Sequence, residues 1–191
     1  MAELHIRRLG DGDDMIALTD LIHAAYAPLA AQGMRYWATH QTVADTIERC
    51  ARGETWLGEM GDHVIATLTL TPPQQAPPAG GVAVPLYARP DVAKLQQFCV
   101  SPAWKGHGVG RQIMDHAEDR ARALGARQLA LDTSEHAAGL IAMYQARGYE
   151  HAGAVDYRPK VNYRSVLLAL ALQPVRIGPA AGGPAEDAAL Q

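Results

Sequence analysis

Residues 95–112 read LQQFCVSPAWKGHGVGRQ. An apolar stretch comes first, a short polar link follows it, and the alternating glycines Gly106, Gly108 and Gly110 precede a helical pattern. Glycines let a backbone approach a ligand without intervening Cβ atoms, and the start of a helix offers unpaired amides with a partial positive charge. The stretch therefore predicts an oxyanion site between a strand and the N-terminus of a helix.

Two other phosphate-binding loops compete for this interpretation. A P-loop needs GxxxxGK followed by Ser or Thr, whereas Gly110 is followed here by Arg111 and Gln112. A dinucleotide fingerprint needs GxGxxG directly after a strand, but the glycines run GxGxG and residues 101–105 intervene. Asp132 does lie at the distance typical of the ribose-binding acid in that fold. A nucleotide-binding oxidoreductase therefore stays as a distant alternative.

The chain around this loop reads as a βαβα unit. We expect a strand over residues 95–100, a helix over 110–124, a strand over 128–132 and a helix over 137–147. Gly125 and Gly148 stand where glycine ends a helix in a left-handed turn. Strands over residues 149–157 and 163–172 then close the sheet. The unbroken apolar run 166–172 indicates a strand that is covered on both faces or paired in a homodimer.

The N-terminal half reads as strand, helix, helix and hairpin. We expect a strand over residues 4–9, then a helix capped by Asp13 or Asp14. A second helix begins at Thr42, with Asp45 three residues later and with Val43, Ile47 and Cys50 on its apolar face. The turn residues Gly61 and Asp62 separate strands over 55–60 and 63–71. Residues 27–40 show no periodicity, and the Pro-, Ala- and Gly-rich residues 72–92 suggest a lid or substrate-facing segment.

Three pieces of this pattern resemble the GNAT superfamily of N-acetyltransferases. Residues 105–110 are similar to its Q/R-x-x-G-x-G/A signature, and residues 98–102 look like its fourth strand with the V-x-P exit. Residues 138–149 resemble its later motif, a tyrosine-bearing helix that ends in glycine and an aromatic residue. The match runs in order over residues 95–149. It implies a single-domain α/β (α+β) fold with a mixed, largely antiparallel twisted sheet of about six to seven strands, about four helices and a splayed parallel strand pair.

The resemblance also implies a reaction, in which an amine attacks the thioester of acetyl-CoA directly. The acceptor would be a primary amine of a small molecule or peptide. Two departures from the family pattern stand out: Lys105 replaces the usual Gln or Arg, and Ala137 stands where many members have an asparagine. The residues that the resemblance assigns to the coenzyme are Phe98, Cys99, Val100, Lys105, Gly106, His107, Gly108, Val109, Gly110, Arg111 and Ala137.

Roles in catalysis and acceptor binding follow from the same resemblance. Tyr144 matches the tyrosine that is often proposed to protonate the departing thiolate, although it could also be an aromatic residue that packs a helix onto the sheet. Tyr36 and Trp37 could line the acceptor pocket or anchor their loop, and Gln97 is a further acceptor-side candidate. Gln96 and Gln97 occupy the strand where some relatives have a glutamate, which leaves the general base open. Candidates for it are His40, Glu54, Tyr87 and Asp132.

Composition limits the alternatives. A chain of 191 residues with 48% hydrophobic content suits one domain, which we expect over residues 1–173, followed by a disordered tail over 174–191. A formal charge of -3 argues against a broad surface for nucleic acid or anionic membrane. Without an apolar leader or spanning segment we expect a cytoplasmic protein. Cys50 and Cys99 read as reduced core thiols, and no motif predicts a metal. A non-catalytic acyl-CoA sensor of the same fold is the main alternative to an enzyme.

Overall fold

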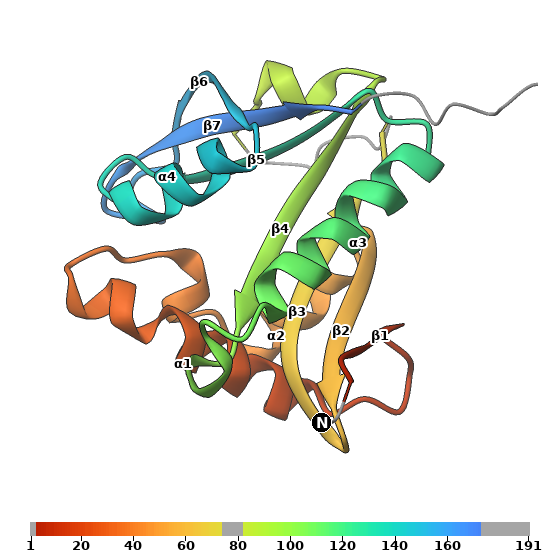
Figure 1. Ribbon diagram of the computed structural model, residues 1–191. Helices are drawn as coiled ribbons and strands as arrows, with labels where there is room; N and C mark the ends of the chain where they lie inside the picture. Colours follow the sequence, from red (N-terminus) through yellow and green to blue (C-terminus); the bar gives the residue numbers. More distant parts are fainter. Residues whose placement is uncertain (1–2, 74–81, 173–191) are drawn as a thin grey trace, which may run out of the picture.

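The computed structural model describes residues 3–73 and 82–172 (Figure 1). The strands are β1 (His5–Arg8), β2 (Glu54–Met60), β3 (His63–Thr71), β4 (Val92–Val100), β5 (Gln128–Ser134), β6 (Glu150–Asp156) and β7 (Arg164–Ala171). The α-helices are α1 (Met15–Ala31), α2 (Val43–Cys50), α3 (Val109–Ala123) and α4 (Ala138–Ala146). Three short 3-10 turns are η1 (Trp37–Thr39), η2 (Pro85–Ala88) and η3 (Pro102–Trp104).

The strands form one sheet with a single parallel contact. Their order is β1-β2-β3-β4-β5-β7-β6, and every neighbouring pair is antiparallel except β4 and β5. That parallel contact joins only Val92, Ala93 and Lys94 to the start of β5. Beyond it the two strands diverge, as Figure 1 shows. The predicted mixed sheet with a splayed parallel pair and four helices is therefore confirmed.

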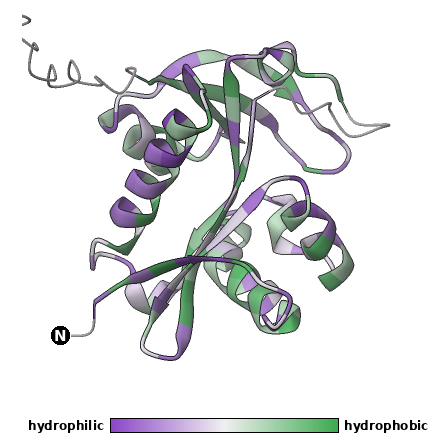
Figure 2. Ribbon diagram, turned by 90° about the vertical axis from the view of Figure 1, so that its right-hand side faces the viewer, coloured by the Kyte–Doolittle hydropathy of each residue, from purple (hydrophilic) through white to green (hydrophobic). Residues whose placement is uncertain are grey.

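Helices cover both faces of the sheet. In Figure 2, α3 lies on one side and α1 with α2 on the other. Ile113, Met114 and Ala117 of α3 pack on the central strands, and Tyr144 of α4 joins the same cluster. A second cluster on the opposite face includes Ile22 of α1. A sheet buried between two helical layers holds the ends of β4 and β5 rigidly, which is where the two strands part.

The predicted helix caps are present. Asp14 accepts hydrogen bonds from the amides of Ile16 and Ala17, and so caps α1. Thr42 and Asp45 form a reciprocal capping box at the start of α2. The first helix runs further than its apolar pattern predicts, through Pro28 to Ala31. The pattern fades there because Pro28 and Leu29, in this last part of α1, line a cavity.

Two expectations from the sequence are wrong in detail. Ile47 is 50% exposed, and the buried residues of α2 are Thr46 and Cys50. This face meets a polar network: the Gln41 side chain donates to Thr46 at 2.7 Å, and Thr19 donates to the Thr46 hydroxyl at 2.8 Å. The apolar pattern along α2 therefore predicts the wrong buried face for this helix.

The second difference is that β4 begins at Val92, three residues earlier than expected, because Val92 pairs with β5.

The apolar run 166–172 is explained by burial in the sheet. β7 lies between β5 and β6, so both of its edges are paired. On one face Leu168 packs in the cluster that α3 covers, and on the other Leu167 contacts Val84 and Val155. The structure thus supports the first of the two alternatives, a strand covered on both faces.

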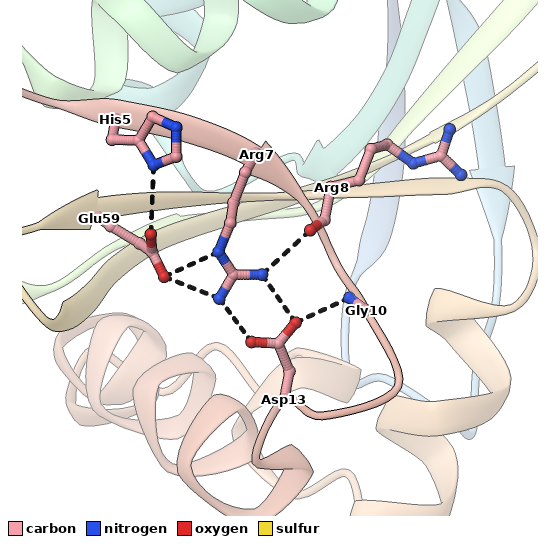
Figure 3. A network of polar contacts seen from close by, with 6 residues as sticks. All are labelled: His5, Arg7, Arg8, Gly10, Asp13 and Glu59. Atoms are coloured by element: carbon pink, nitrogen blue, oxygen red, sulfur yellow. Dashed lines mark hydrogen bonds and ion pairs between the residues drawn. The ribbon is translucent and has the colours of Figure 1, made fainter.

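A charged network ties β1 and β2 to the start of α1 (Figure 3). The Arg7 guanidinium donates to both oxygens of Asp13 at 2.6 and 2.8 Å and to Glu59 at 2.7 and 2.9 Å. The Asp13 carboxylate also accepts from the Gly10 amide at 2.7 Å. Hydrogen bonds from Arg7 lower the pKa of both carboxyl groups below their ordinary values. The cluster fixes the loop that leads into α1.

We expect this network to add modest stability that depends on pH. A double-mutant cycle of Arg7→Gln and Asp13→Asn should give a coupling energy of about 1 kcal/mol at neutral pH, measured by urea unfolding. Because the folded-state pKa of Asp13 is lowered, the contribution is fully present above the unfolded pKa near ~4 and is lost as the pH falls through the folded value. A coupling energy that stays constant down to strongly acidic pH would contradict this assignment.

Parts of three expectations fall outside the described ranges. The first is the proposed tail over residues 174–191, and the second is the domain boundary after residue 173. The third is the suggested lid, of which residues 74–81 lie outside the described ranges. Of that segment, residues 82–91 contain η2, and Val84 packs against β6 and β7. Within the described residues, no helix is long and apolar enough to cross a membrane.

Candidate functional site

The site begins where β4 leaves β5. Opposite β3, the register of β4 shifts between Gln96 and Cys99, and Gln97 adopts a left-handed conformation with φ 54°. A non-glycine residue in this region marks a bulge that bends its strand. After the bulge, Phe98 has no partner in the register with β3, and its carbonyl accepts a hydrogen bond from the Tyr26 hydroxyl at 3.1 Å. This half of β4 therefore presents main-chain groups to the opening between the two strands.

A large cavity occupies that opening. Its volume is about 1200 Å³, and it extends from the glycine loop along β4 to α1, α2 and η2. Phe98, Cys99 and Val100 line one wall, and Leu131, Asp132 and Thr133 of β5 line the other. A space of this size suits an elongated ligand together with a second small molecule. The splay of the sheet thus creates a binding site in the middle of the fold.

The glycine loop lies at one end of this cavity. Gly106 and Gly108 have φ near +80° (80° and 78°), and a Cβ atom added to either would meet open space. Gly110 packs against the strand, since its Cβ position lies 3.6 Å from atoms of Phe98 and Val100. Within the described residues, no acceptor contacts the amides of Gly106, Gly108, Val109, Gly110 or Arg111. Five unpaired donors at the start of a helix are an arrangement that can bind an anion.

The side chains around the loop add positive charge. Lys105 lines the cavity, and both Lys105 and Arg111 are exposed and make no ion pair in the part of the chain that the structure describes. The exposed His107 contacts the Lys105 carbonyl at 3.0 Å and lies edge-on to Trp104. Ala137 differs from these residues, because its side chain packs in the core beside α1. Its place as a coenzyme contact stays a prediction.

Tyr144 reaches the cavity from α4. The residue is 6% exposed, and its ring packs at 5.5 Å from that of Tyr149. Its hydroxyl accepts or donates no hydrogen bond among the described residues, yet the residue lines the cavity. Burial raises the pKa of this phenol well above its ordinary value. Tyr144 can therefore donate a hydrogen bond into the cavity at any physiological pH.

The three acceptor-side candidates differ in the hydrogen bonds and the exposure of their side chains. The Tyr36 hydroxyl contacts Thr133 at 2.8 Å and accepts from the Ser134 amide at 3.2 Å, so it anchors its segment to β5. Gln97 is 3% exposed and its carboxamide is held by Gln41 and Thr69. Trp37 lines the cavity and stays partly exposed. Of the three, Trp37 alone makes no side-chain hydrogen bond among the described residues, although its ring lies 5.5 Å from that of His40 and 5.4 Å from the Lys160 ammonium.

The candidate bases separate into two pairs. Glu54 is bound by Arg8 and Arg120 on the far side of the sheet, and neither it nor His40 lines the cavity. Tyr87 and Asp132 do line it, and the Tyr87 hydroxyl donates to the Asp132 carboxylate at 2.8 Å. The Lys94 ammonium lies 3.8 Å from the same carboxylate. Asp132 is therefore the one carboxylate among these candidates that could take a proton inside the cavity.

Burial also decides the chemistry of Cys99. The residue is buried, and burial raises the pKa of its thiol to about 12. Such a thiol carries almost no thiolate at neutral pH and is a poor nucleophile. This agrees with the prediction that Cys99 is a core residue of the strand.

Sequence reasoning did not single out several groups that line the cavity. Tyr26 holds the bulged end of β4, and Arg49 and Lys94 bring positive charge to the end of the cavity away from the glycine loop. Tyr26 reads as an apolar-face residue of a helix, and Arg49 as an ordinary surface charge. Only the packing of α1 and α2 against the splayed strands brings Tyr26 and Arg49 to the same cavity.

The sequence model of the acetyltransferase (GNAT) family matches residues 19–149. The chain belongs to this family. Among curated proteins, S-(2-succino)cysteine N-acetyltransferase of Bacillus subtilis is 26% identical over 151 residues, which is 78% of this chain and 86% of that protein. The matched region contains the loop, the bulged strand and α4, so the acetyltransferase motifs lie on the walls of the cavity.

Solved structures agree on the fold. A GNAT family acetyltransferase from Elizabethkingia anophelis with acetyl-CoA bound is 15% identical, has a TM-score of 0.64, and the match covers 88% of this chain and 98% of that chain. The ribosomal-protein-S18-alanine N-acetyltransferase of Escherichia coli is 17% identical with a TM-score of 0.65, over 89% and 94% of the two chains. The protein is an acetyl-CoA-dependent N-acetyltransferase, as the sequence predicts.

Proposed function

We propose that this acetyltransferase binds the pyrophosphate of acetyl-CoA on the amides of Gly106 and residues 108–111 and transfers the acetyl group to a small amine. The observation that carries the proposal is the set of five unpaired amides that open beside β4 at the end of a 1200 Å³ cavity. The pantetheine arm would follow Phe98, Cys99 and Val100, with its thioester close to Tyr144. Lys105 and Arg111 would add charge at the phosphates.

The proposed reaction is a direct transfer. The neutral amine attacks the thioester carbonyl, the C–S bond breaks, and the amide nitrogen loses its extra proton. The Tyr144 hydroxyl gives its proton to the departing sulfur, which leaves as the thiol of CoA, and the tyrosinate regains a proton from water as Asp132 releases its own to water. Asp132, oriented by Tyr87 and Lys94, accepts the proton from the amine directly or through water. An alkyl amine with a pKa near ~10.4 is only about 0.04% neutral at pH 7, so such an acceptor needs this help.

Ligand binding tests the coenzyme part of the proposal. Acetyl-CoA at about 100 times its Kd should stabilise the protein by roughly 2.7 kcal/mol, which raises the Tm by about 5 to 11 °C for a chain of this size. NADH serves as the control, because it also carries a pyrophosphate and an adenosine. A shift with NADH and none with acetyl-CoA would contradict the proposal and favour a nucleotide-binding oxidoreductase.

Turnover tests the catalytic part. Release of free thiol from acetyl-CoA should rise when amines, amino acids, peptides or aminoglycosides are added. The release is followed with a thiol-reactive dye. Tight binding of acetyl-CoA without acceleration by any member of a broad panel would favour a non-catalytic acyl-CoA sensor.

A further inference from the structure

The lining of the cavity carries an excess of positive charge. Five cationic side chains and three carboxylates line the whole cavity: Arg49, Arg52, Lys94, Lys105 and Lys160 against Asp45, Glu48 and Asp132. Of these cations only Lys105 belongs to the glycine loop. The other four outnumber the three carboxylates by one, so this lining favours an acceptor that carries negative charge.

All three carboxylates already have partners. Asp45 accepts from the Thr42 amide at 2.7 Å as part of the cap of α2, and Glu48 pairs with Arg52 at 2.6 Å. Asp132 is held by Tyr87 and lies 3.8 Å from Lys94. None of them makes an ion pair with Arg49. Within the described residues, Arg49 therefore has no carboxylate partner.

Arg49 is partly buried in the wall of the cavity and has no carboxylate partner among the described residues. Burial lowers the pKa of its guanidinium, although the group stays charged at neutral pH. Removing a charged group from water without a counter-charge costs free energy, and an anionic ligand in the cavity would supply that counter-charge to Arg49. The guanidinium donates one hydrogen bond, to the Gln41 side-chain oxygen at 2.5 Å. Its other nitrogens are not sealed inside the protein, so they are free to donate into the cavity.

The Arg49 side chain is held in place by a rigid polar network. Gln41 is 1% exposed, and its amide nitrogen donates to Thr46 at 2.7 Å and to Gln97 at 3.0 Å. Gln97 in turn is the residue at the bulge of β4. The same network thus joins the guanidinium to the strand that lines the thioester end of the proposed site. A planar guanidinium fixed in this way suits bidentate binding of a carboxylate.

We propose that Arg49 binds a carboxylate of the acceptor, so that the acceptor is a small amino acid and not a plain alkylamine. This inference rests on the proposed function, since it names the class of substrate for the same cavity. The acceptor carboxylate neutralises Arg49, while Asp132, in the opposite wall, faces the amine. The arrangement separates the two charges of a zwitterion across the cavity.

Matched acceptors test the charge requirement directly. Thiol release from acetyl-CoA is measured with a panel of free amino acids and with the carboxamide of each one. The amide has the less basic amine and so offers more of the reactive neutral form. A higher kcat/KM for the free acid therefore reports recognition of the carboxylate. Equal or better turnover of the amides would overturn the proposal.

Variants of Arg49 connect the preference to this side chain. Arg49→Gln should lower kcat/KM for the free acid by about 10- to 150-fold, the worth of hydrogen bonds to a charged group, and leave the amide unaffected. Arg49→Lys keeps the charge but loses the planar guanidinium, so its kcat/KM for the free acid should lie between those of the wild type and Arg49→Gln. Arg122→Gln removes the same charge from the outer surface of α3, where Arg122 pairs with Asp119, and serves as the matched control. An equal loss with acids and amides would assign Arg49 a structural role.

Binding of the product gives a readout that does not need turnover. With CoA saturating, N-acetyl amino acids should raise the Tm of the wild-type protein, whereas their amides should not, and Arg49→Gln should abolish the shift. The absence of any shift with the acids would overturn the carboxylate site. Normal binding of acetyl-CoA in that same experiment would show that the coenzyme part of the proposed function stands. Loss of acetyl-CoA binding in the wild-type protein would instead contradict the proposed function itself.

Discussion

Gly108→Asp is expected to weaken binding of acetyl-CoA by more than about 100-fold. Gly108 is the N-cap of α3, and its Cβ position faces open space beside the unpaired amides. An aspartate there would place a carboxylate where the pyrophosphate is proposed to bind, and like charges in contact cost several kcal/mol. A local carboxylate would also occupy the amides as an N-cap. Isothermal titration with acetyl-CoA measures the effect.

Gly108→Asn is the matched control for this experiment. The φ of +78° strains any side chain, but Asn and Asp tolerate the left-handed region about equally well. Both variants should therefore lose similar stability, roughly 1 kcal/mol, by urea unfolding without ligand. The difference in Kd between them reports the negative charge alone. Equal affinity of the two variants for acetyl-CoA would remove the pyrophosphate from this loop.

The sequence predicts the elements whose signals are local. The capping box of α2 and the glycines after α3 and α4 depend on neighbouring residues, and the structure has them as expected. The bulge at Gln97 had no such signal, because it arises from the register between β3 and β4. The same holds for the start of β4 at Val92, which depends on pairing with β5. Contacts between segments distant in the sequence determine both features, so the local residue pattern does not predict them.

The site divides in the same way. The glycines and the lysine of residues 105–110 lie in one short stretch, so the sequence alone predicts an anion site there. Arg49 lies about fifty residues away, on a helix whose orientation the apolar pattern misjudged at Ile47. The proposal for Arg49 rests on its place in the cavity wall without a carboxylate partner among the described residues, and only the packing of α2 reveals that place. A surface arginine and an acceptor-binding arginine have the same sequence pattern.

Tyr144→Phe is expected to lower kcat by roughly 100-fold, the lower range for loss of a positioned proton donor. The phenylalanine ring keeps the packing against Tyr149 and the core cluster, so folding should be unaffected. The change removes only the hydroxyl that faces the cavity. Because a phenol stabilises the departing sulfur only as charge develops there, the loss should fall on kcat and not on the Kd for acetyl-CoA.

A thiol leaving group of lower pKa sharpens the test of Tyr144. A thiolate of low pKa leaves without a proton more readily than the thiolate of CoA, so it depends less on a hydrogen-bond donor. The kcat values of the wild-type protein and Tyr144→Phe should therefore differ less with such an acyl donor than with acetyl-CoA. Tyr149→Phe is the control, since it removes a buried hydroxyl that lies 3.5 Å from Glu118, on a residue that does not line the cavity. Its kcat should match that of the wild type. Equal kcat values for all three proteins would make Tyr144 a packing residue, and the proton for the thiolate would then have to come from water or from Tyr26, whose hydroxyl already donates to Phe98.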